Sequence, residues 1–159
     1  KVSSKTGVGS TFSFILPFGK TTMQIVEEVE ILKLDSTIKN MRVLVAEDVV
    51  LNQLLIKMIL SEFGFEYVVV NNGKIAIEQL QTHTYDIILM DIQMPEMNGF
   101  EATEYIRKTM KSNIPIIALT ADVTTVDIAK CKEFGMDAYI SKPIDENELY
   151  NKIMALVNK

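Results

Sequence analysis

Five side chains of this 159-residue sequence could together bind a divalent cation and a phosphoryl group. They are two adjacent acids, a third acid, a hydroxyl and an amine: Glu47, Asp48, Asp91, Thr120 and Lys142. Carboxylates that meet at one place raise one another's pKa values, and a hard divalent cation relieves that repulsion. A site of oxygen ligands suits Mg²⁺, which keeps several of its waters. The amine and the hydroxyl can each hold a phosphoryl oxygen, so the set predicts phosphoryl transfer to a carboxylate.

Each of these residues also has an ordinary structural explanation when it is taken alone. Asp48 could cap a turn or a helix, and Thr120 could be a turn hydroxyl. Lys142 precedes Pro143 and could be a surface lysine. The functional interpretation therefore requires that the five side chains meet, and this depends on the elements that carry them.

Residues 41–159 alternate short apolar runs with helical patterns. Strands are expected over residues 41–46, 67–70, 86–90, 115–119 and 138–140. Nearly continuous apolar strands are typical of a parallel sheet that is covered on both faces. Five consecutive strand–helix units predict an α/β fold, a doubly wound five-stranded parallel sheet with helices on both faces.

The segments between these strands, and the segment after the last one, have the apolar periodicity of helices. The first helix carries an apolar stripe that stops at Gly64 and consists of Leu51, Leu54, Leu55, Met58 and Ile59. Short helices are expected around residues 74–81 and 124–134, and another begins near Gly99 with one side formed by Phe100, Thr103, Ile106 and Met110. The last begins near Asp145, a suitable N-cap with Glu148 three residues on, as in a capping box. Its inward residues are expected to be Leu149, Ile153, Leu156 and Val157.

The candidate residues all follow expected strands. Glu47 and Asp48 come after the first strand and Asp91 after the third, while Thr120 and Lys142 follow the fourth and the fifth. In open α/β sheets, ligands bind beyond the carboxyl ends of the strands. Because all five residues follow strands of the same sheet, five unrelated structural roles explain them poorly. We expect them to form one binding site.

Four segments of this region resemble the receiver domain of two-component response regulators, and they come in the family's order: residues 43–48, 90–99, 118–121 and 139–143. The resemblance implies the flavodoxin- or receiver-like strand order 2-1-3-4-5. It further implies that Asp91 is the phosphoacceptor and that Asp48, Asp91 and the backbone carbonyl of Gln93 bind Mg²⁺ or Mn²⁺, with Glu47 acting through a metal-bound water. By the same resemblance, Lys142 contacts the phosphate, and Thr120 and Tyr139 form the switch.

The resemblance also implies partners. The phosphodonor would be a histidine kinase dimerisation domain, a histidine phosphotransfer protein, or a small molecule such as acetyl phosphate. Such a domain catalyses only its own phosphorylation and dephosphorylation. A weak homodimer of the chain is a further partner that the resemblance leaves open. The Lys142–Pro143 bond is often cis in the family.

Residues 1–18 alternate polar and apolar side chains around a Gly-rich turn, and Phe12, Phe14 and Leu16 share one face of an expected strand. The segment resembles the closing strand of a histidine-kinase ATP-binding domain. The expected organisation is therefore a kinase remnant over 1–18, a linker over 19–40 and a receiver over 41–159. We expect the C-terminal receiver of a hybrid histidine kinase, without the kinase catalytic core and without a following output domain.

Composition restricts the other partners. The net charge is −5 without a cluster of Lys or Arg, which argues against nucleic acid. The apolar runs are too short to cross a bilayer, and no membrane contact is expected. A single cysteine, Cys131, excludes an intrachain disulfide and suits a cytoplasmic location. The only histidine, His83, lies in an expected loop and should be exposed to solvent.

Three other functions share features with this sequence. A phosphohydrolase of the haloacid-dehalogenase type also uses an Asp nucleophile and Mg²⁺, but it has a second Asp two residues on, where this chain has Gln93. A flavodoxin-like binder needs a phosphate loop after the first strand, where Glu47 and Asp48 would repel a phosphate. The third, an unphosphorylated interaction module on the same fold, would not need the five candidate residues intact.

Overall fold

The computed structural model describes residues 1–15, 41–121 and 125–157. The chain divides into two compact units, Lys1–Lys33 and Leu34–Lys159, which are described separately. The expected linker over 19–40 lies outside the described residues.

The N-terminal unit contains a hairpin where one strand was expected. Strand β1 (Val2–Lys5) pairs antiparallel with β2 (Gly9–Phe12), with Val2 opposite Phe12. The turn uses Gly7 at a φ of 78°, a conformation that glycine adopts without strain. Phe14 lies beyond the strand and Leu16 lies outside the described residues. Every hairpin residue is exposed, and two strands without a buried face are marginal alone. That the hairpin is a piece of a larger sheet stays a prediction.

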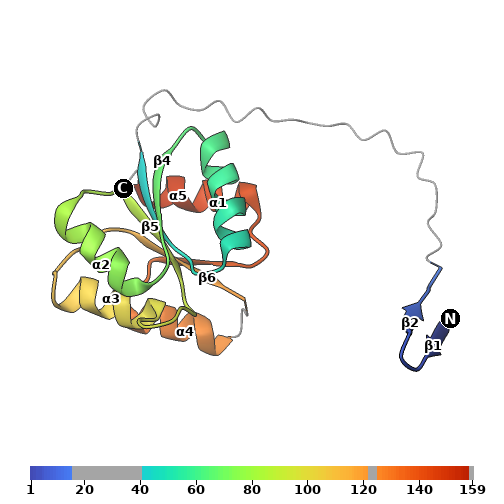
Figure 1. Ribbon diagram of the computed structural model, residues 1–159. Coiled ribbons are helices and arrows are strands. Elements are labelled where there is room, and N and C mark those ends of the chain that lie inside the picture. The colour runs from blue at the N-terminus through green and yellow to red at the C-terminus, as the bar shows by residue number, and fades with distance from the viewer. Residues whose placement is uncertain (16–40, 122–124, 158–159) are drawn as a thin grey trace. The chain divides into compact units, whose positions relative to one another are not determined.

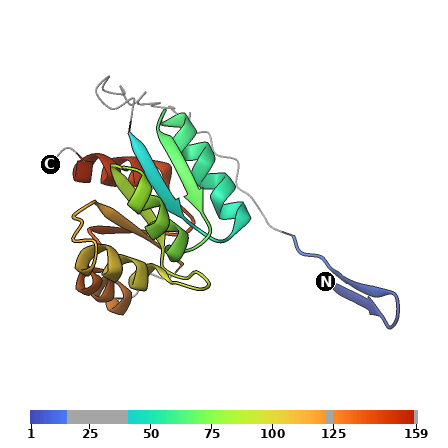
Figure 2. The same cartoon turned by 60° about the vertical axis from the view of Figure 1, so that its left-hand side comes forward.

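The second unit is built on a five-stranded parallel sheet in the order β4-β3-β5-β6-β7. Counted from the first strand of this unit, the order is 2-1-3-4-5, and the expected fold class is confirmed (Figures 1 and 2). The two central strands, β5 and β6, are buried along their whole length. The strands are β3 (Arg42–Ala46), β4 (Glu66–Val70), β5 (Ile87–Asp91), β6 (Ile116–Thr120) and β7 (Ala138–Ser141).

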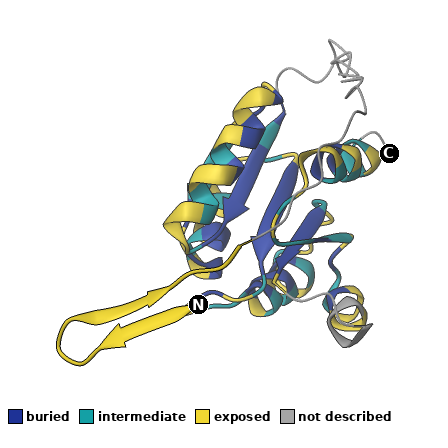
Figure 3. Ribbon diagram, turned by 90° about the vertical axis from the view of Figure 1, so that its right-hand side faces the viewer, coloured by how far each residue is buried: buried dark blue, intermediate teal, exposed yellow. Residues whose placement is uncertain are grey.

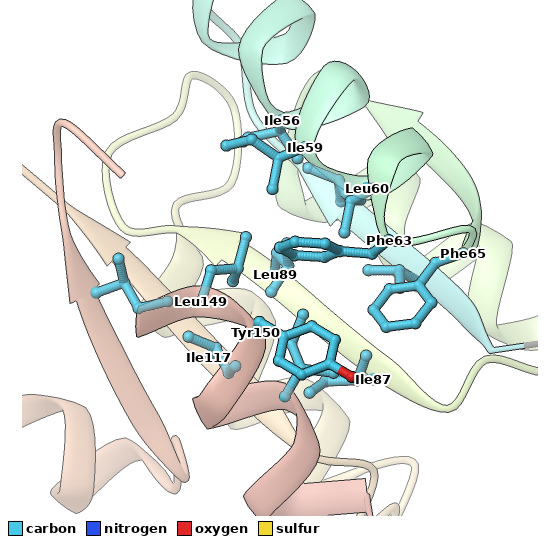
Figure 4. Packing of buried hydrophobic residues seen from close by; sticks show 14 of the residues in the cluster. Ile56, Ile59, Leu60, Phe63, Phe65, Ile87, Leu89, Ile117, Leu149 and Tyr150 are labelled. Atoms are coloured by element: carbon cyan, nitrogen blue, oxygen red, sulfur yellow. The ribbon is translucent and has the colours of Figure 1, made fainter. Parts of the chain in front are cut away.

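Five helices cover the two faces of this sheet: α1 (Val50–Glu62), α2 (Gly73–Thr82), α3 (Gly99–Lys108), α4 (Thr125–Phe134) and α5 (Glu146–Val157). Helices α1 and α5 lie on one face, and α2, α3 and α4 lie on the other (Figure 1). Successive strand residues serve opposite faces: Leu89 packs in the core under α1 and α5, whereas Ile88 and Met90 pack on the other side. Figure 4 shows the core under α1 and α5, where the Phe63 and Tyr150 rings pack edge to face with their centroids 5.1 Å apart. No described helix combines the length and apolar character that crossing a bilayer requires.

The apolar stripe predicted for the first helix is wrong as a guide to its buried face. Four of its five residues are exposed, namely Leu51, Leu54, Leu55 and Met58. The buried face instead carries Ile56, Ile59 and Leu60. Helix α1 has apolar residues on two sides, so periodicity alone could not decide which side packs on the sheet. Its outer face stays open to solvent (Figure 3).

This correction predicts unequal effects for two leucines of α1. Leu60→Ala should lower the free energy of unfolding by about 3 kcal/mol, because Leu60 is fully buried between helix and sheet. Leu54→Ala should change it by no more than about 0.5 kcal/mol, because 56% of Leu54 is exposed. Urea denaturation of both variants measures the difference, and equal losses would contradict the observed orientation of the helix.

The start of α5 follows the expected capping in part. The Glu148 N–H donates to Asp145 Oδ1 at 2.8 Å, so Asp145 caps α5. The Glu148 carboxylate, expected to complete the capping box, instead pairs with Lys152 Nζ at 2.6 Å. Along α5, Leu149 and Ile153 are buried as predicted.

Candidate functional site

The carboxyl ends of β3, β5, β6 and β7 meet around one cavity of about 400 Å³. Residues that the sequence analysis selected line it: Asp48, Asp91, Gln93, Thr120 and Lys142. Parallel strands bring these positions together because β5 is the neighbour of both β3 and β6, with Met90 level with Ala46 and with Ala118. The candidate residues are therefore neighbours in space.

Three carboxylates form the centre of the site. Oxygens of Glu47, Asp48 and Asp91 all lie within 4.8 Å of one another. Glu47 and Asp91 are buried, while Asp48 is the most open of the three. Hard carboxylate oxygens at this spacing fit a divalent cation that accepts few protein ligands and keeps waters, as Mg²⁺ does.

Lys142 supplies the positive charge of the site. Its Nζ donates to Glu47 Oε2 and to Asp91 Oδ2, each at 2.6 Å. The backbone N–H of Lys142 donates to Thr120 O at 2.7 Å, which fixes the start of the loop that carries this side chain. The Lys142–Pro143 peptide bond is cis, as the resemblance predicted.

Burial and charge move the pKa values of this pair. Burial raises the pKa of the Asp91 carboxyl, and the Glu47 charge raises it further, against the hydrogen bond from Lys142. Burial would lower the pKa of the Lys142 ammonium, but its hydrogen bonds to Asp91 and Glu47 outweigh burial and the pKa rises. The negative charge of the buried Asp91 carboxylate therefore depends on a nearby cation.

The loop after β5 orients Asp91. The Gln93 N–H donates to Asp91 Oδ1 at 3.1 Å, so the two carboxylate oxygens have different partners. Gly99 packs directly against the backbone here, since a Cβ at this position would lie 2.2 Å from Asp91 O. Gly99 is thus needed for its lack of a side chain.

The two predicted switch residues lie at different distances from the cavity. Thr120 ends β6, is buried and lines the cavity. Tyr139 is half-buried in β7 and is not part of the lining. Lys152 Nζ donates to Tyr139 O at 2.5 Å and lies 4.7 Å from the centre of the Tyr139 ring. His83 is exposed, as predicted.

Sequence reasoning missed two amide side chains of α1. Asn52 Nδ2 donates to Glu47 Oε1 at 2.9 Å, and Gln53 Nε2 donates to Glu47 O at 2.6 Å. The available signal was that two adjacent amides interrupt the apolar run of residues 49–56, five and six positions after Glu47.

The fold and the site define a class of protein: a doubly wound parallel sheet with an acid cluster and a lysine at the carboxyl ends of its strands. Residues 43–154 match the family model described as the response regulator receiver domain. The chain belongs to this family, and it carries a receiver domain of a two-component phosphorelay. The assignment favours this function over the phosphohydrolase and flavodoxin-like alternatives.

Similar proteins agree with this assignment. Probable histidine kinase 6 of Oryza sativa subsp. japonica is 36% identical over 72% of this chain and 14% of its own length. Hybrid signal transduction histidine kinase I of Dictyostelium discoideum is 42% identical over 74% of this chain and 7% of its own length. The chain thus spans at most about a seventh of these relatives.

Solved structures show the same fold. The receiver domain of sensor histidine kinase PA1611 from Pseudomonas aeruginosa is 32% identical, with a TM-score of 0.69 over 76% of this chain and 99% of that domain. That structure has a magnesium ion coordinated in its active site cleft. The receiver domain of Ssk1 from Saccharomyces cerevisiae is 29% identical, with a TM-score of 0.70 over 75% of this chain and 90% of that domain. It was crystallised with the histidine phosphotransfer protein Ypd1.

Proposed function

We propose that Asp91 accepts a phosphoryl group from a phosphohistidine on a partner protein, or from a small donor such as acetyl phosphate. One observation carries the proposal: Lys142 Nζ lies 2.6 Å from Asp91 Oδ2, inside a cluster of acids whose oxygens lie within 4.8 Å of one another. This arrangement supplies a nucleophile, a fixed positive charge and ligands for a cation, which are what phosphoryl transfer requires.

Mg²⁺ is the proposed cofactor, and Mn²⁺ would serve in its place. Asp48, Asp91 and the backbone carbonyl of Gln93 would hold the ion directly, and Glu47 would hold it through a water. When bound, the ion would neutralise the acid cluster and the oxygens of the incoming phosphoryl group.

Asp91, Lys142 and Thr120 would each have a separate role in the transfer. An Asp91 carboxylate oxygen attacks the phosphorus in line as the bond from phosphorus to the donor breaks. Lys142 Nζ, which already contacts Asp91 Oδ2, can hold a phosphoryl oxygen without a large movement. Thr120 lines the same cavity and would donate its hydroxyl to another oxygen. Water later releases the phosphate, so the domain would catalyse only its own phosphorylation and dephosphorylation.

The proposed switch follows from charge added at Asp91. Thr120 would move toward the phosphoryl group and Tyr139 would turn inward, which requires the contact between the Tyr139 ring and Lys152 to rearrange. Because Lys152 belongs to α5 and Tyr139 to β7, the surface of α4, β7 and α5 would change with the state of Asp91.

The phosphodonor partner would dock on the exposed apolar face of α1. We define this α1 face as Val50, Leu51, Leu54, Leu55 and Met58, which are between 39% and 75% exposed. The face adjoins the site, because α1 also supplies Asn52 to the cavity and Leu55 to a smaller cavity of about 80 Å³ beside Lys142. An apolar face of this kind marks a protein contact, and an amphipathic helix bearing a phosphohistidine fits it. The co-crystallised Ssk1 receiver and Ypd1 give a precedent for such a partner.

A charge placed on the α1 face should slow phosphoryl transfer from a protein donor but not from a small-molecule donor. Leu54→Asp should slow phosphoryl transfer from a phosphorylated histidine phosphotransfer protein by about 10-fold or more, because the buried charge weakens docking. Acetyl phosphate needs no docking face and should act at the wild-type rate.

Tyr105→Asp is the matched control, since Tyr105 is a 37% exposed apolar side chain on α3, away from the site. Equal rates for Leu54→Asp and wild type with the protein donor would remove α1 from the docking surface.

Incubation with Mg²⁺ and acetyl phosphate tests the proposed function itself. The intact mass should rise by one phosphoryl group, and the gain should disappear when Mg²⁺ is chelated. A chain that gains no mass with any donor would instead support an unphosphorylated interaction module.

We infer a parent protein of the hybrid histidine kinase type, with the receiver on the cytoplasmic side. Two observations support this: the similar curated proteins are histidine kinases, and the exposed hairpin of residues 1–15 has apolar side chains such as Phe12 and Phe14 that another sheet could cover. The segment 1–18 would then be the last part of an ATP-binding domain and 19–40 a linker. The sequence of the full-length gene tests this by the presence or absence of an upstream helix with a phosphorylatable histidine.

A further inference from the structure

Asn52 lies on the first turns of α1 and reaches the most buried acid of the site. Its Nδ2 donates to Glu47 Oε1 at 2.9 Å, and Glu47 has no exposed surface. The same side chain lines both the cavity at the acid cluster and the smaller cavity beside Pro143. Neither the family match nor the chemistry of the five candidate residues assigns it a role.

The two oxygens of Glu47 have different partners. Oε2 accepts from Lys142 Nζ at 2.6 Å, on the side of Asp91. Oε1 accepts from Asn52 and, at a longer 3.2 Å, from the Val49 N–H. Both donors to Oε1 are uncharged, so they fix its position without neutralising the carboxylate that the cation needs.

Gln53 holds the backbone of the same residue. Its Nε2 donates to Glu47 O at 2.6 Å and to Asn71 Oδ1 at 2.9 Å. Consecutive amides of one helix thus hold the main chain and the side chain of Glu47. Loss of the Asn52 bond would leave Oε1 with only the longer bond from the Val49 N–H, and the carboxylate could turn away from the acid cluster.

We propose that Asn52 is a positioning residue that orients the Glu47 carboxylate and thereby sets the affinity of the site for its divalent cation. It acts through Glu47, and it contacts neither Asp91 nor Lys142 in the hydrogen bonds of the described residues. Residues that orient metal ligands from outside typically change metal affinity by about 10- to 100-fold when they are replaced. The inference rests on the proposed function of the acid cluster as a Mg²⁺ site.

Asn52→Leu tests the inference by calorimetric titration of the protein with Mg²⁺. The variant keeps the approximate size of the side chain and removes the donor, so Mg²⁺ affinity should fall about 10-fold. Asn151→Leu, the same change at an exposed position of α5, should leave affinity unchanged. If Asn52→Leu does not fold, Asn52→Ala removes the donor without adding apolar bulk.

A double-mutant cycle with Glu47→Met tests whether Asn52 changes Mg²⁺ affinity through Glu47. In that background the carboxylate is gone, and Asn52→Leu should change Mg²⁺ affinity by less than about twofold. Wild-type affinity in Asn52→Leu, or an equal loss in both backgrounds, would overturn the inference and leave the function of Asp91 untouched. A wild-type protein that binds Mg²⁺ but gains no phosphoryl group would overturn the function and leave the role of Asn52 standing. Absence of Mg²⁺ binding by the wild type would overturn both.

Discussion

Asp91→Asn is expected to reduce phosphoryl uptake to background while the fold stays intact. The amide has nearly the shape of the carboxylate, but it has no anionic oxygen to attack phosphorus. Because burial raises the pKa of the Asp91 carboxyl, the ionised form is the costly one in the cation-free protein. Replacement by a neutral amide should therefore not lower the free energy of unfolding near neutral pH. Intact mass after incubation with acetyl phosphate and Mg²⁺ measures uptake, and urea denaturation measures stability.

Asp86→Asn is the matched control for this change. Asp86 lies just before β5, at the opposite end from Asp91, and its Oδ2 accepts from the Arg42 N–H at 2.7 Å. It is exposed and far along the strand from the acid cluster, so its variant should take up phosphoryl groups at the wild-type rate. Uptake by Asp91→Asn equal to that of Asp86→Asn would show that another residue is the acceptor.

Lys142→Met should have the second largest effect, and it should act on both rate and stability. The variant loses the only positive charge that contacts Glu47 and Asp91 among the hydrogen bonds and ion pairs of the described residues. Loss of one fixed group that stabilises developing charge typically slows a reaction by about 10²- to 10³-fold, and we expect this for phosphoryl uptake. Acetyl phosphate with excess Mg²⁺ gives the rate by intact mass.

The stability of the same variant should depend on the cation. Removing one partner of a buried ion pair leaves an uncompensated charge, and for this side chain, still 19% exposed, we expect a loss of about 2–3 kcal/mol without Mg²⁺. Mg²⁺ should raise the melting temperature of Lys142→Met more than that of wild type, because it would replace the missing charge. Lys108→Met is the control: this lysine pairs with Glu104 on the surface and is 74% exposed. A Mg²⁺ response no larger than that of wild type would remove Lys142 from the charge balance of the site.

The strands and their order of appearance could be predicted because their apolar runs are nearly continuous. Ile87 to Met90 have no exposed surface, and a strand buried on both faces needs apolar residues at every position. The chemical residues were visible for the same reason, since each interrupts or follows such a run. The site could therefore be predicted as a set of residue types at strand ends, before any distance was known.

The periodicity of α1 could not predict its buried face, because two rows of apolar residues fit the same helical period. Leu54 and Leu60 both belong to apolar rows of α1, yet only Leu60 is buried. Which row packs inward depends on the sheet and on α5 across from it, and no window of α1 contains that information. In the N-terminal segment the sequence predicts only a strand through Phe12, Phe14 and Leu16. It gives no sign of the partner strand Val2–Lys5, because that strand is short and mostly polar.

Asp91 as an acid at a strand end follows from the sequence alone, and its likeness to a phosphoacceptor follows from the residues around it. The residues that contact Asp91 cannot be predicted from the sequence alone. Lys142 is 51 residues away from it along the chain and Glu47 is 44 residues away in the other direction, yet one ammonium contacts both carboxylates. Such contacts are decided by the pairing of β5 with its neighbouring strands and by where α1 lies on the sheet. For that reason only the tertiary structure shows Asn52 against Glu47, on a helix that the sequence marks by its apolar rows alone.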